Sequence, residues 1–576
     1  MKKKPKVPKE WLTHFENSGM LESPDYETTI QYFERLEKES PFVQIKNIGL
    51  TPQERQIKVI IVSKDKAFVP VEAKKTGKAI ILIQNGIHPG EIEGKDACMI
   101  LLREILVTKE KEHLLDNLIL LIIPVLNIDG HERPSPFNRP NQNGPKQMGW
   151  RTNALNLNLN RDYMKADSLE TKAFLKMFYE WTPDFIIDNH STNGADYQYH
   201  VTYGIETHRN MDENLVKWIN EKYLPHLLTN VEKDGFLTAP YVEFKNGTIE
   251  SGIKNWHALP RLSHGYCAAQ NRVCLLVETH SLKPFENRVF STLSMMHHSL
   301  EYINENHAEL ILYNLKAEKE TIKKYCRHKE LFPLVLMGTE KSEQFNFKGF
   351  RWIDEQSEIT GSAVRKYSDE PVDVLIPLYN EVKVTKYIML PFAYFIPPQF
   401  TNIIEVLRSQ HIKYFRFRRD KTAVVERYRF KNISFHPYPY EGRHLPKYDV
   451  EMFEEEVVIP AGSVWVPVDQ RQLKVIVHLL EPESPDSLVS WGFFNAFFER
   501  KEYAESYVME PYAKRMIEND PKLKEEFLQK LNSEELFRNN PSERLDFFYR
   551  RSPFYDKGEN VYPIFRVKQR IDDRSS

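Results

Sequence analysis

The first half of the chain alternates short apolar runs with longer amphipathic stretches. Continuous apolar runs predict buried strands at 79–84, 118–126, 184–190 and 273–278, with a weaker one at 199–203. Between them, apolar residues recur every three or four positions, which predicts helices at 91–107, 168–180, 210–228 and 285–312. This alternation is typical of an α/β domain, so we expect a mixed, largely parallel sheet flanked by helices.

After about residue 316 the pattern changes to a charged helical stretch and then to shorter apolar runs, which predict a second, β-rich α+β domain. Pro397 and Pro398 are expected to open a helix around 400–410. The last part of the chain is aromatic and charged with helical spacing. We predict an amino-terminal extension (1–24) and the α/β domain (25–315). These are followed by a β-rich accessory domain (320–487) and a helical carboxy-terminal segment (488–576) that packs on the accessory domain.

The ends of the predicted strands are the places to look for chemistry, because ligands bind beyond the carboxyl ends of the strands in parallel sheets. The polar side chains found there are His88, Glu91, His190 and Glu278. A long segment, 128–163, is rich in Asn, Pro and Gly. It is too long for a simple connecting loop, so it is either functional or disordered. Its tryptophan and arginines favour a functional loop.

The charge balance argues against a nucleic-acid partner. The 576 residues include 79 Lys and Arg against 81 Asp and Glu, a net charge of −2, so the chain has no general attraction to a polyanion. One segment, 413–421, interleaves basic and aromatic residues as a polyanion or glycan site would. A solvated strand face is the simpler interpretation of that segment.

Cysteine usage and the apolar runs limit the class further. Four cysteines without a C-x-x-C pair exclude a disulfide scaffold and a zinc-finger type of site. The basic start is not followed by the apolar stretch of a secretory signal. The longest apolar run, 118–126, is about half of what a membrane span needs. We therefore expect no membrane span and a cytoplasmic location, unless a leader was removed.

The residues at the strand ends suit a metal. Histidine and glutamate are ligands that zinc accepts, and a catalytic zinc commonly takes three protein ligands plus water. His88 and Glu91 alone also fit a solvated turn, but His190 ends another strand of the same domain and can converge on them. Glu278 ends an apolar strand, where a carboxylate is costly to bury without a task or an ion pair.

The motifs HPGE, GWRTN, LNLNRDY, DNHST and LLVETHS, in this order, resemble those of the zinc carboxypeptidase family of carboxypeptidase A. The resemblance covers about residues 25–315, and the chain is also similar to a bacterial branch of the family with an appended domain at about 320–576. It implies one Zn²⁺ per chain and a peptide or protein substrate with a free C-terminus. The implied roles are zinc binding for His88, Glu91 and His190, general base for Glu278, carbonyl polarisation for Arg151, and carboxylate binding for Asn160 and Arg161.

Three positions extend or depart from that pattern. Family members often carry an Asp where this chain has Asn158, which can only accept the imidazole N–H of a zinc ligand through a neutral carbonyl. Tyr266 is the candidate for the family's mobile substrate-binding tyrosine, although its spacing to Glu278 is short. Arg261 lies about where the family lines the pocket for the leaving side chain, which suggests a preference for an acidic residue; the alternative is that Arg261 pairs with a local acid.

Two other functions remain open at this point. A zinc amidase acting on murein peptides or acylated amino acids would use the same metal site, and the Asn160–Arg161 pair favours carboxypeptidase only moderately because murein peptides also carry free carboxylates. A non-catalytic peptide-binding protein could keep the scaffold, but the presence of Glu278 and Arg151 argues against it. No feature of the sequence specifies an oligomeric state.

Overall fold

The computed structural model describes residues 7–192, 194–208, 210–254 and 257–571. An eight-stranded mixed sheet forms the centre of the first half, in the order β1-β2-β4-β3-β5-β9-β6-β7. Its strands are β1 (Val43–Leu50), β2 (Gln56–Val62), β3 (Ala79–Gln84), β4 (Leu118–Ile123), β5 (Phe185–Ser191), β6 (Val201–Gly204), β7 (Thr238–Pro240) and β9 (Val273–Thr279). The five strands expected from the sequence are all present.

The middle of this sheet is parallel. β4, β3, β5 and β9 lie side by side in parallel register, and β1, β2 and β6 add antiparallel pairs around them. Every residue of β3, β4 and β5 is buried, as the uninterrupted apolar runs predict for strands covered on both faces. The expectation of a largely parallel sheet flanked by helices is therefore confirmed.

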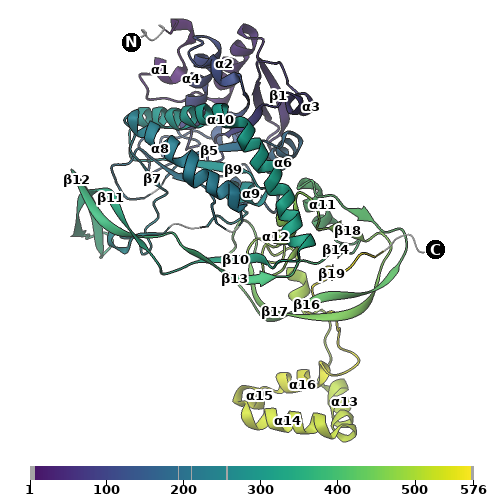
Figure 1. The fold of residues 1–576 in the computed structure, drawn as a ribbon. Coiled ribbons are helices and arrows are strands. Elements are labelled where there is room, and N and C mark those ends of the chain that lie inside the picture. Colours follow the sequence, from purple (N-terminus) through teal and green to yellow (C-terminus); the bar gives the residue numbers. More distant parts are fainter. Residues whose placement is uncertain (1–6, 193, 209, 255–256, 572–576) are drawn as a thin grey trace.

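Helices cover the sheet and join the two halves (Figure 1). α4 and α8 both pack against α10, whereas α6 and α9 contact the sheet at β1 and at β5 and β9. α10 bends at Asn306 and continues towards the carboxy-terminal half. The helices of this half are α1 (His14–Asn17), α2 (Tyr26–Glu39), α3 (Pro70–Lys75), α4 (Glu93–Leu106), α5 (Ile128–His131), α6 (Leu169–Trp181), α7 (Glu213–Trp218), α8 (Leu224–Lys233), α9 (Ser263–Ala269) and α10 (Phe285–Ile322).

The carboxy-terminal half is β-rich, as expected. A six-stranded sheet has the order β15-β18-β14-β19-β16-β17, and two smaller groups are β10 with β13 and β11 with β12 and β8. β8 (Ile253–Lys254) comes from the α/β domain. The strands of the carboxy-terminal half are β10 (Phe332–Gly338), β11 (Glu343–Gln356), β12 (Ala363–Tyr379), β13 (Val382–Ile388), β14 (Ala393–Ile396), β15 (Phe415–Arg416), β16 (Lys421–Phe435), β17 (Pro446–Ile459), β18 (Val464–Pro467) and β19 (Phe565–Val567). Helices α11 (Thr401–Ser409) and α12 (Leu473–Leu480) complete it.

The last segment divides into two kinds of structure. α13 (Ser506–Asn519), α14 (Pro521–Ser533), α15 (Glu535–Asn539) and α16 (Pro541–Tyr549) share a small hydrophobic cluster of their own and project away from the rest of the molecule (Figure 1). The strand β19, in contrast, pairs with β14 and β16. Within 488–576, β19 is therefore part of the six-stranded sheet, whereas the four helices pack on one another.

The two halves share one hydrophobic core. The largest cluster of buried side chains contains Phe15 from the amino-terminal extension, Ile83 from β3, and Tyr394 and Tyr562 from the carboxy-terminal half. The accessory half also reaches back through its hairpins, because β12 pairs with β8 of the α/β domain. The candidate site below is therefore bordered by residues from both halves.

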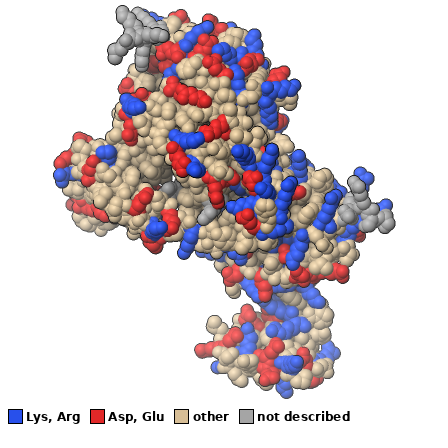
Figure 2. Space-filling model, in the orientation of Figure 1, with Lys and Arg blue, Asp and Glu red and all other residues tan. Residues whose placement is uncertain are grey.

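The surface and the cysteines match the composition. Positive and negative side chains are interspersed over the face shown in Figure 2. Among the described residues, no helix combines the length and apolar character that a membrane crossing requires. Cys98, Cys267 and Cys274 are buried free thiols, and Cys326 is a partly buried one.

Candidate metal centre and active site

The strand ends bring the predicted metal ligands together. His88 and Glu91 lie in the turn after β3, and the Glu91 N–H donates to the His88 carbonyl at 2.8 Å, which places their side chains on the same side. His190 lies in β5, the parallel neighbour of β3. His88 Nδ1 and His190 Nδ1 both face Glu91 Oε2, at 3.1 and 2.9 Å. The three side chains are buried, and their ligand atoms lie within 4.8 Å of one another.

The outer nitrogens of both imidazoles are also bound. His190 Nε2 contacts Asp188 Oδ2 at 3.0 Å, and His88 Nε2 contacts Asn158 Oδ1 at 3.0 Å, as the sequence predicts for that position. Such partners fix the orientation and tautomer of a metal-binding imidazole. Two Nδ1 atoms and one carboxylate in a buried group are the donors of a three-ligand zinc site. The residues present therefore fit a zinc ion.

Two arginines hold Glu91 from the other side. Arg139 Nη2 and Arg151 Nη1 contact Glu91 Oε1 at 2.9 and 3.0 Å, which leaves Oε2 facing the histidines. Gly90 is required for this approach, because a Cβ there would lie 2.6 Å from Arg139 Cγ. Arg139 is buried, whereas the Arg151 side chain is 36% exposed. Arg151 is thus the arginine that can move towards a substrate.

The charges of this group depend on one another. Burial disfavours the imidazolium form and lowers the pKa of His88 to about 4. Burial acts on His190 in the same sense, but Asp188 and Glu91 outweigh it and hold the pKa of His190 well above its ordinary value. Despite its burial, the pKa of Glu91 is held well below its ordinary value by His88 and Arg139. The neighbouring charges thus favour the imidazolium form of His190 and the ionised form of Glu91.

Glu278 lies beside this group on the adjacent strand. In the parallel register of β5 and β9, Glu278 is the direct partner of His190. Burial, together with the negative charges of Glu91 and Asp188, raises the pKa of Glu278 to about 8. A raised pKa in a carboxylate next to metal-ligand side chains is expected of a general base.

The raised pKa of Glu278 predicts that the folding stability of the chelator-treated protein falls as pH rises. A carboxyl whose pKa is higher in the folded state stabilises the fold below its unfolded pKa and loses that contribution as pH rises through about 8. Glu278→Gln is therefore expected to make the metal-free protein more stable than the wild type at pH 9, by about 1 to 3 kcal/mol. The difference should shrink towards pH 5.

Urea denaturation of chelator-treated protein at both pH values measures this difference. Glu286→Gln, a change at an exposed carboxylate on α10, provides the control. Equal stability of Glu278→Gln and wild type at pH 9 would contradict the raised pKa.

Asn160 and Arg161 lie in a short 3-10 turn, Leu159–Arg161. Asn160 Oδ1 accepts a hydrogen bond from the Ser263 N–H at 3.0 Å, so its NH₂ group is the part that can meet a carboxylate. Arg161 Nη1 donates to the Asn160 carbonyl at 2.7 Å, and Arg161 Nε donates to the Tyr440 hydroxyl at 3.0 Å. Arg161 also lines a cavity of about 590 Å³ between the two halves.

Tyr266 is not a substrate-binding residue, which corrects the sequence-based expectation. Its side chain is 2% exposed and packs against Tyr163 and Phe178. Its hydroxyl donates to Gln410 Oε1 at 2.8 Å. A tyrosine held in the core by these contacts cannot swing over a substrate.

Arg261 also requires correction. It lines the same cavity as Arg161, but its Nε contacts Asp486 Oδ1 at 2.6 Å and its backbone N–H donates to Asp486 Oδ2 at 2.9 Å. Its guanidinium lies over the ring of Trp491. The positive charge is therefore neutralised, and the expected preference for an acidic leaving residue loses its basis. The alternative, an ion pair, is correct, although the acid comes from the accessory half.

Sequence reasoning missed several residues of this site. Arg139 lies in the long polar loop whose arginines were noted, and Asp188 is two residues before His190 on the same strand face, so both had a local signal. Tyr440 and Asp486 had none, because they are more than 200 residues from the positions that they contact.

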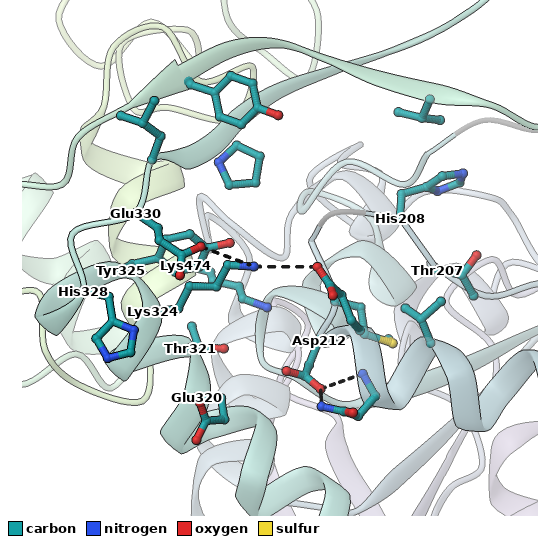
Figure 3. A pocket seen from close by; sticks show the side chains of 18 residues that line it. Thr207, His208, Asp212, Glu320, Thr321, Lys324, Tyr325, His328, Glu330 and Lys474 are labelled. Carbon is teal, nitrogen blue, oxygen red and sulfur yellow. Dashed lines mark hydrogen bonds and ion pairs between the residues drawn. The ribbon is translucent and has the colours of Figure 1, made fainter.

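A second cavity, of about 680 Å³, lies away from the metal group (Figure 3). It is lined by residues of the α/β domain, of the end of α10 and of the accessory half, such as Asp212, Thr321 and Lys474. Lys474 is buried there and donates to the Asn210 carbonyl and to Asn271 Oδ1, both at 2.6 Å. None of the candidate site residues lines this cavity.

Comparison with known proteins supports a family assignment. Residues 29–275 match the family model of zinc carboxypeptidase. Carboxypeptidase 2 of Trichophyton rubrum is 21% identical over 482 residues, covering 81% of this chain and 83% of that protein. Carboxypeptidase 2 of Trichophyton tonsurans is 20% identical with the same coverage. Because these alignments are longer than the α/β domain, they include part of the carboxy-terminal half.

Solved structures show partial similarity. A metallo-carboxypeptidase from Burkholderia cenocepacia has a TM-score of 0.36 and 17% identity, covering 49% of this chain and 69% of that one. One from Pseudomonas aeruginosa, in complex with (2-guanidinoethylmercapto)succinic acid, has a TM-score of 0.37 and 16% identity, covering 50% and 69%. Taken together, the family model and the sequence relatives place a zinc carboxypeptidase domain at residues 29–275 of this chain.

Proposed function

We propose that this protein hydrolyses the last peptide bond of peptides or proteins that have a free carboxyl end. The match of residues 29–275 to the zinc carboxypeptidase model and the similarity to carboxypeptidase 2 support a hydrolase of the zinc metallocarboxypeptidase type. The observation that carries the proposal is the placement of Glu278 on the strand next to His190, beside a buried group of three metal-ligand side chains.

The proposed mechanism assigns one task to each residue. His88, Glu91 and His190 would hold the zinc, which when bound supplies a Lewis acid that acidifies water and polarises a carbonyl. Glu278 would take a proton from the attacking water and return it to the leaving amine. Arg151, partly exposed at the edge of the group, would stabilise the negative charge that develops on the carbonyl oxygen.

Asn160 and Arg161 would bind the terminal carboxylate. A guanidinium forms paired, charge-assisted hydrogen bonds with a carboxylate, and a permanent positive charge selects for a free chain end. This selection separates a carboxypeptidase from an endopeptidase. An amidase of acylated amino acids or murein peptides can also act on molecules with a free carboxylate. Carboxylate binding therefore separates the two functions only if Arg161 binds the carboxylate of the residue that is released.

The substitution Arg161→Ala tests whether Arg161 binds the terminal carboxylate. We expect KM for a free-ended peptide to rise about 100-fold, because a charge-assisted pair worth about 3 kcal/mol is lost, while kcat changes little. Steady-state kinetics on a blocked dipeptide measure both constants. Arg133→Ala, at an exposed arginine of the same long loop, is the matched control and should leave KM unchanged. An unchanged KM in Arg161→Ala would favour the amidase alternative.

A further inference from the structure

The accessory half contributes a tight turn to the candidate active site. β16 and β17 form a long hairpin, and residues 436–445 form its tip. At the tip, the Tyr440 N–H donates to the Arg443 carbonyl at 2.9 Å and the Arg443 N–H donates to the Tyr440 carbonyl at 3.1 Å. The two residues between them, Glu441 and Gly442, have φ of +50° and +75°. Two left-handed residues between a bonded pair make a compact turn that matches the strand twist.

The tip contacts the segment that carries Asn160 and Arg161 at three places. Glu441 Oε2 accepts a hydrogen bond from the Asn158 N–H at 2.9 Å. The Tyr440 hydroxyl accepts one from Arg161 Nε at 3.0 Å. Arg443 Nη2 contacts Asp167 Oδ1 at 2.9 Å. The hairpin therefore holds residues 158–167 before a substrate enters.

The tip itself is supported from behind by the accessory half. The ring of Tyr440 lies nearly parallel to that of Trp491, with a centroid distance of 6.0 Å and an interplanar angle of 15°. The Arg443 guanidinium lies 4.0 Å from the centre of the Phe493 ring. Asn495 Nδ2 donates to the His444 carbonyl at 2.9 Å. With these contacts, the Tyr440 hydroxyl has a defined position.

Tyr440 acts on the orientation of Arg161. The bonds of Arg161 to Tyr440 and to the Asn160 carbonyl use Nε and Nη1, and two fixed nitrogens define the plane of a guanidinium. Tyr440 and Arg161 also line the same cavity of about 590 Å³. A hydroxyl that accepts one bond still has its own proton to donate, so Tyr440 can also donate to a carboxylate held at Arg161.

We propose that Tyr440 is a positioning residue for Arg161, so that the carboxy-terminal half builds part of the subsite for the terminal residue of the peptide. This inference rests on the proposed function, in which Arg161 binds the terminal carboxylate. It gives the accessory half a direct role in substrate affinity.

Tyr440→Phe tests the inference because it removes one oxygen atom and keeps the ring on Trp491. The matched control is Tyr438→Phe, at a tyrosine of the same tip that is 80% exposed. In the full-length zinc-loaded enzyme, we expect KM for a free-ended blocked dipeptide to rise about tenfold, the effect of losing a hydrogen bond to a charged group, with kcat within about twofold. Tyr438→Phe should match the wild type in both constants.

A binding measurement separates this inference from the proposed function. In a Glu278→Gln background, calorimetry should show about tenfold weaker binding of the free-ended peptide when Tyr440→Phe is added. Binding of the amidated peptide should not change. If the wild type hydrolyses no peptide but carboxylate binding still depends on Tyr440, the proposed function fails and the inference stands.

Two results would overturn the inference. One is unchanged binding and unchanged KM in Tyr440→Phe. The other is equal affinity of the Glu278→Gln protein for free-ended and amidated peptides, since Arg161 would then bind no carboxylate. A lower melting temperature in Tyr440→Phe with unchanged KM would show that the contact only stabilises the fold.

Discussion

Glu278→Gln is expected to lower kcat by about 1000-fold while KM and zinc content stay close to those of the wild type. Glutamine has the same shape as glutamate, but it cannot accept the proton of the attacking water. Glu278 lies next to His190 in the parallel register of β5 and β9, so the change should leave the metal ligands in place. Steady-state kinetics and metal analysis of the same preparation measure the two effects separately.

Glu286→Gln again serves as the control, because it removes a carboxylate of equal size from an exposed position. Loss of zinc in Glu278→Gln would show that Glu278 supports the metal. Full activity with zinc present would assign the general base to another residue.

His190→Ala is expected to abolish both zinc binding and activity. His190 supplies one of the three ligand atoms, and two remaining ligands do not hold zinc at micromolar concentrations. The change also removes the partner of Asp188, a buried carboxylate, which we expect to cost about 3 kcal/mol of folding stability. Metal analysis after gel filtration and urea denaturation measure the two losses.

Asp188→Asn distinguishes loss of a ligand from loss of the fold. It keeps all three ligands but removes the charge that orients His190, so zinc affinity should fall about 10- to 100-fold without being lost. His113→Ala, at a histidine that is 51% exposed, should bind zinc as the wild type does. Zinc binding to His190→Ala with wild-type affinity would contradict the assigned ligand set.

The sequence predicted the α/β domain well because its strands are buried on both faces. A run such as 118–123 has no polar position, so it specifies a central strand almost without reference to the rest of the chain. The same strands fix where His88, His190 and Glu278 lie, because parallel strands end at one edge of the sheet. The convergence of these residues therefore followed from local patterns.

The expectations that were wrong depended on contacts between distant parts of the chain. Tyr266 has a reasonable position before Glu278, but the partner that fixes its hydroxyl is Gln410 in the accessory half. Arg261 has the charge of a specificity residue, but Asp486 neutralises it. Neither partner has a pattern that points to the site. Long-range pairs of this kind are decided by the tertiary packing of the two halves.

Tyr440, at the tip of the β16–β17 hairpin, also could not be predicted from local sequence. Tyr440 lies in a segment that reads as an ordinary turn between two strands, and only the fold brings it to Arg161. The role that we propose for the accessory half is thus not indicated by the motifs of the α/β domain.

The most direct test of the central claim is a mass-spectrometric time course. Zinc-loaded protein is incubated with a mixed pool of free-ended peptides and their amidated twins, with Glu278→Gln protein as the parallel sample. We expect free-ended peptides to lose single carboxy-terminal residues in sequence, the amidated twins to remain intact, and the Glu278→Gln sample to show no change. Internal cleavage, equal loss from amidated peptides, or no mass change in the wild-type sample would contradict the carboxypeptidase assignment.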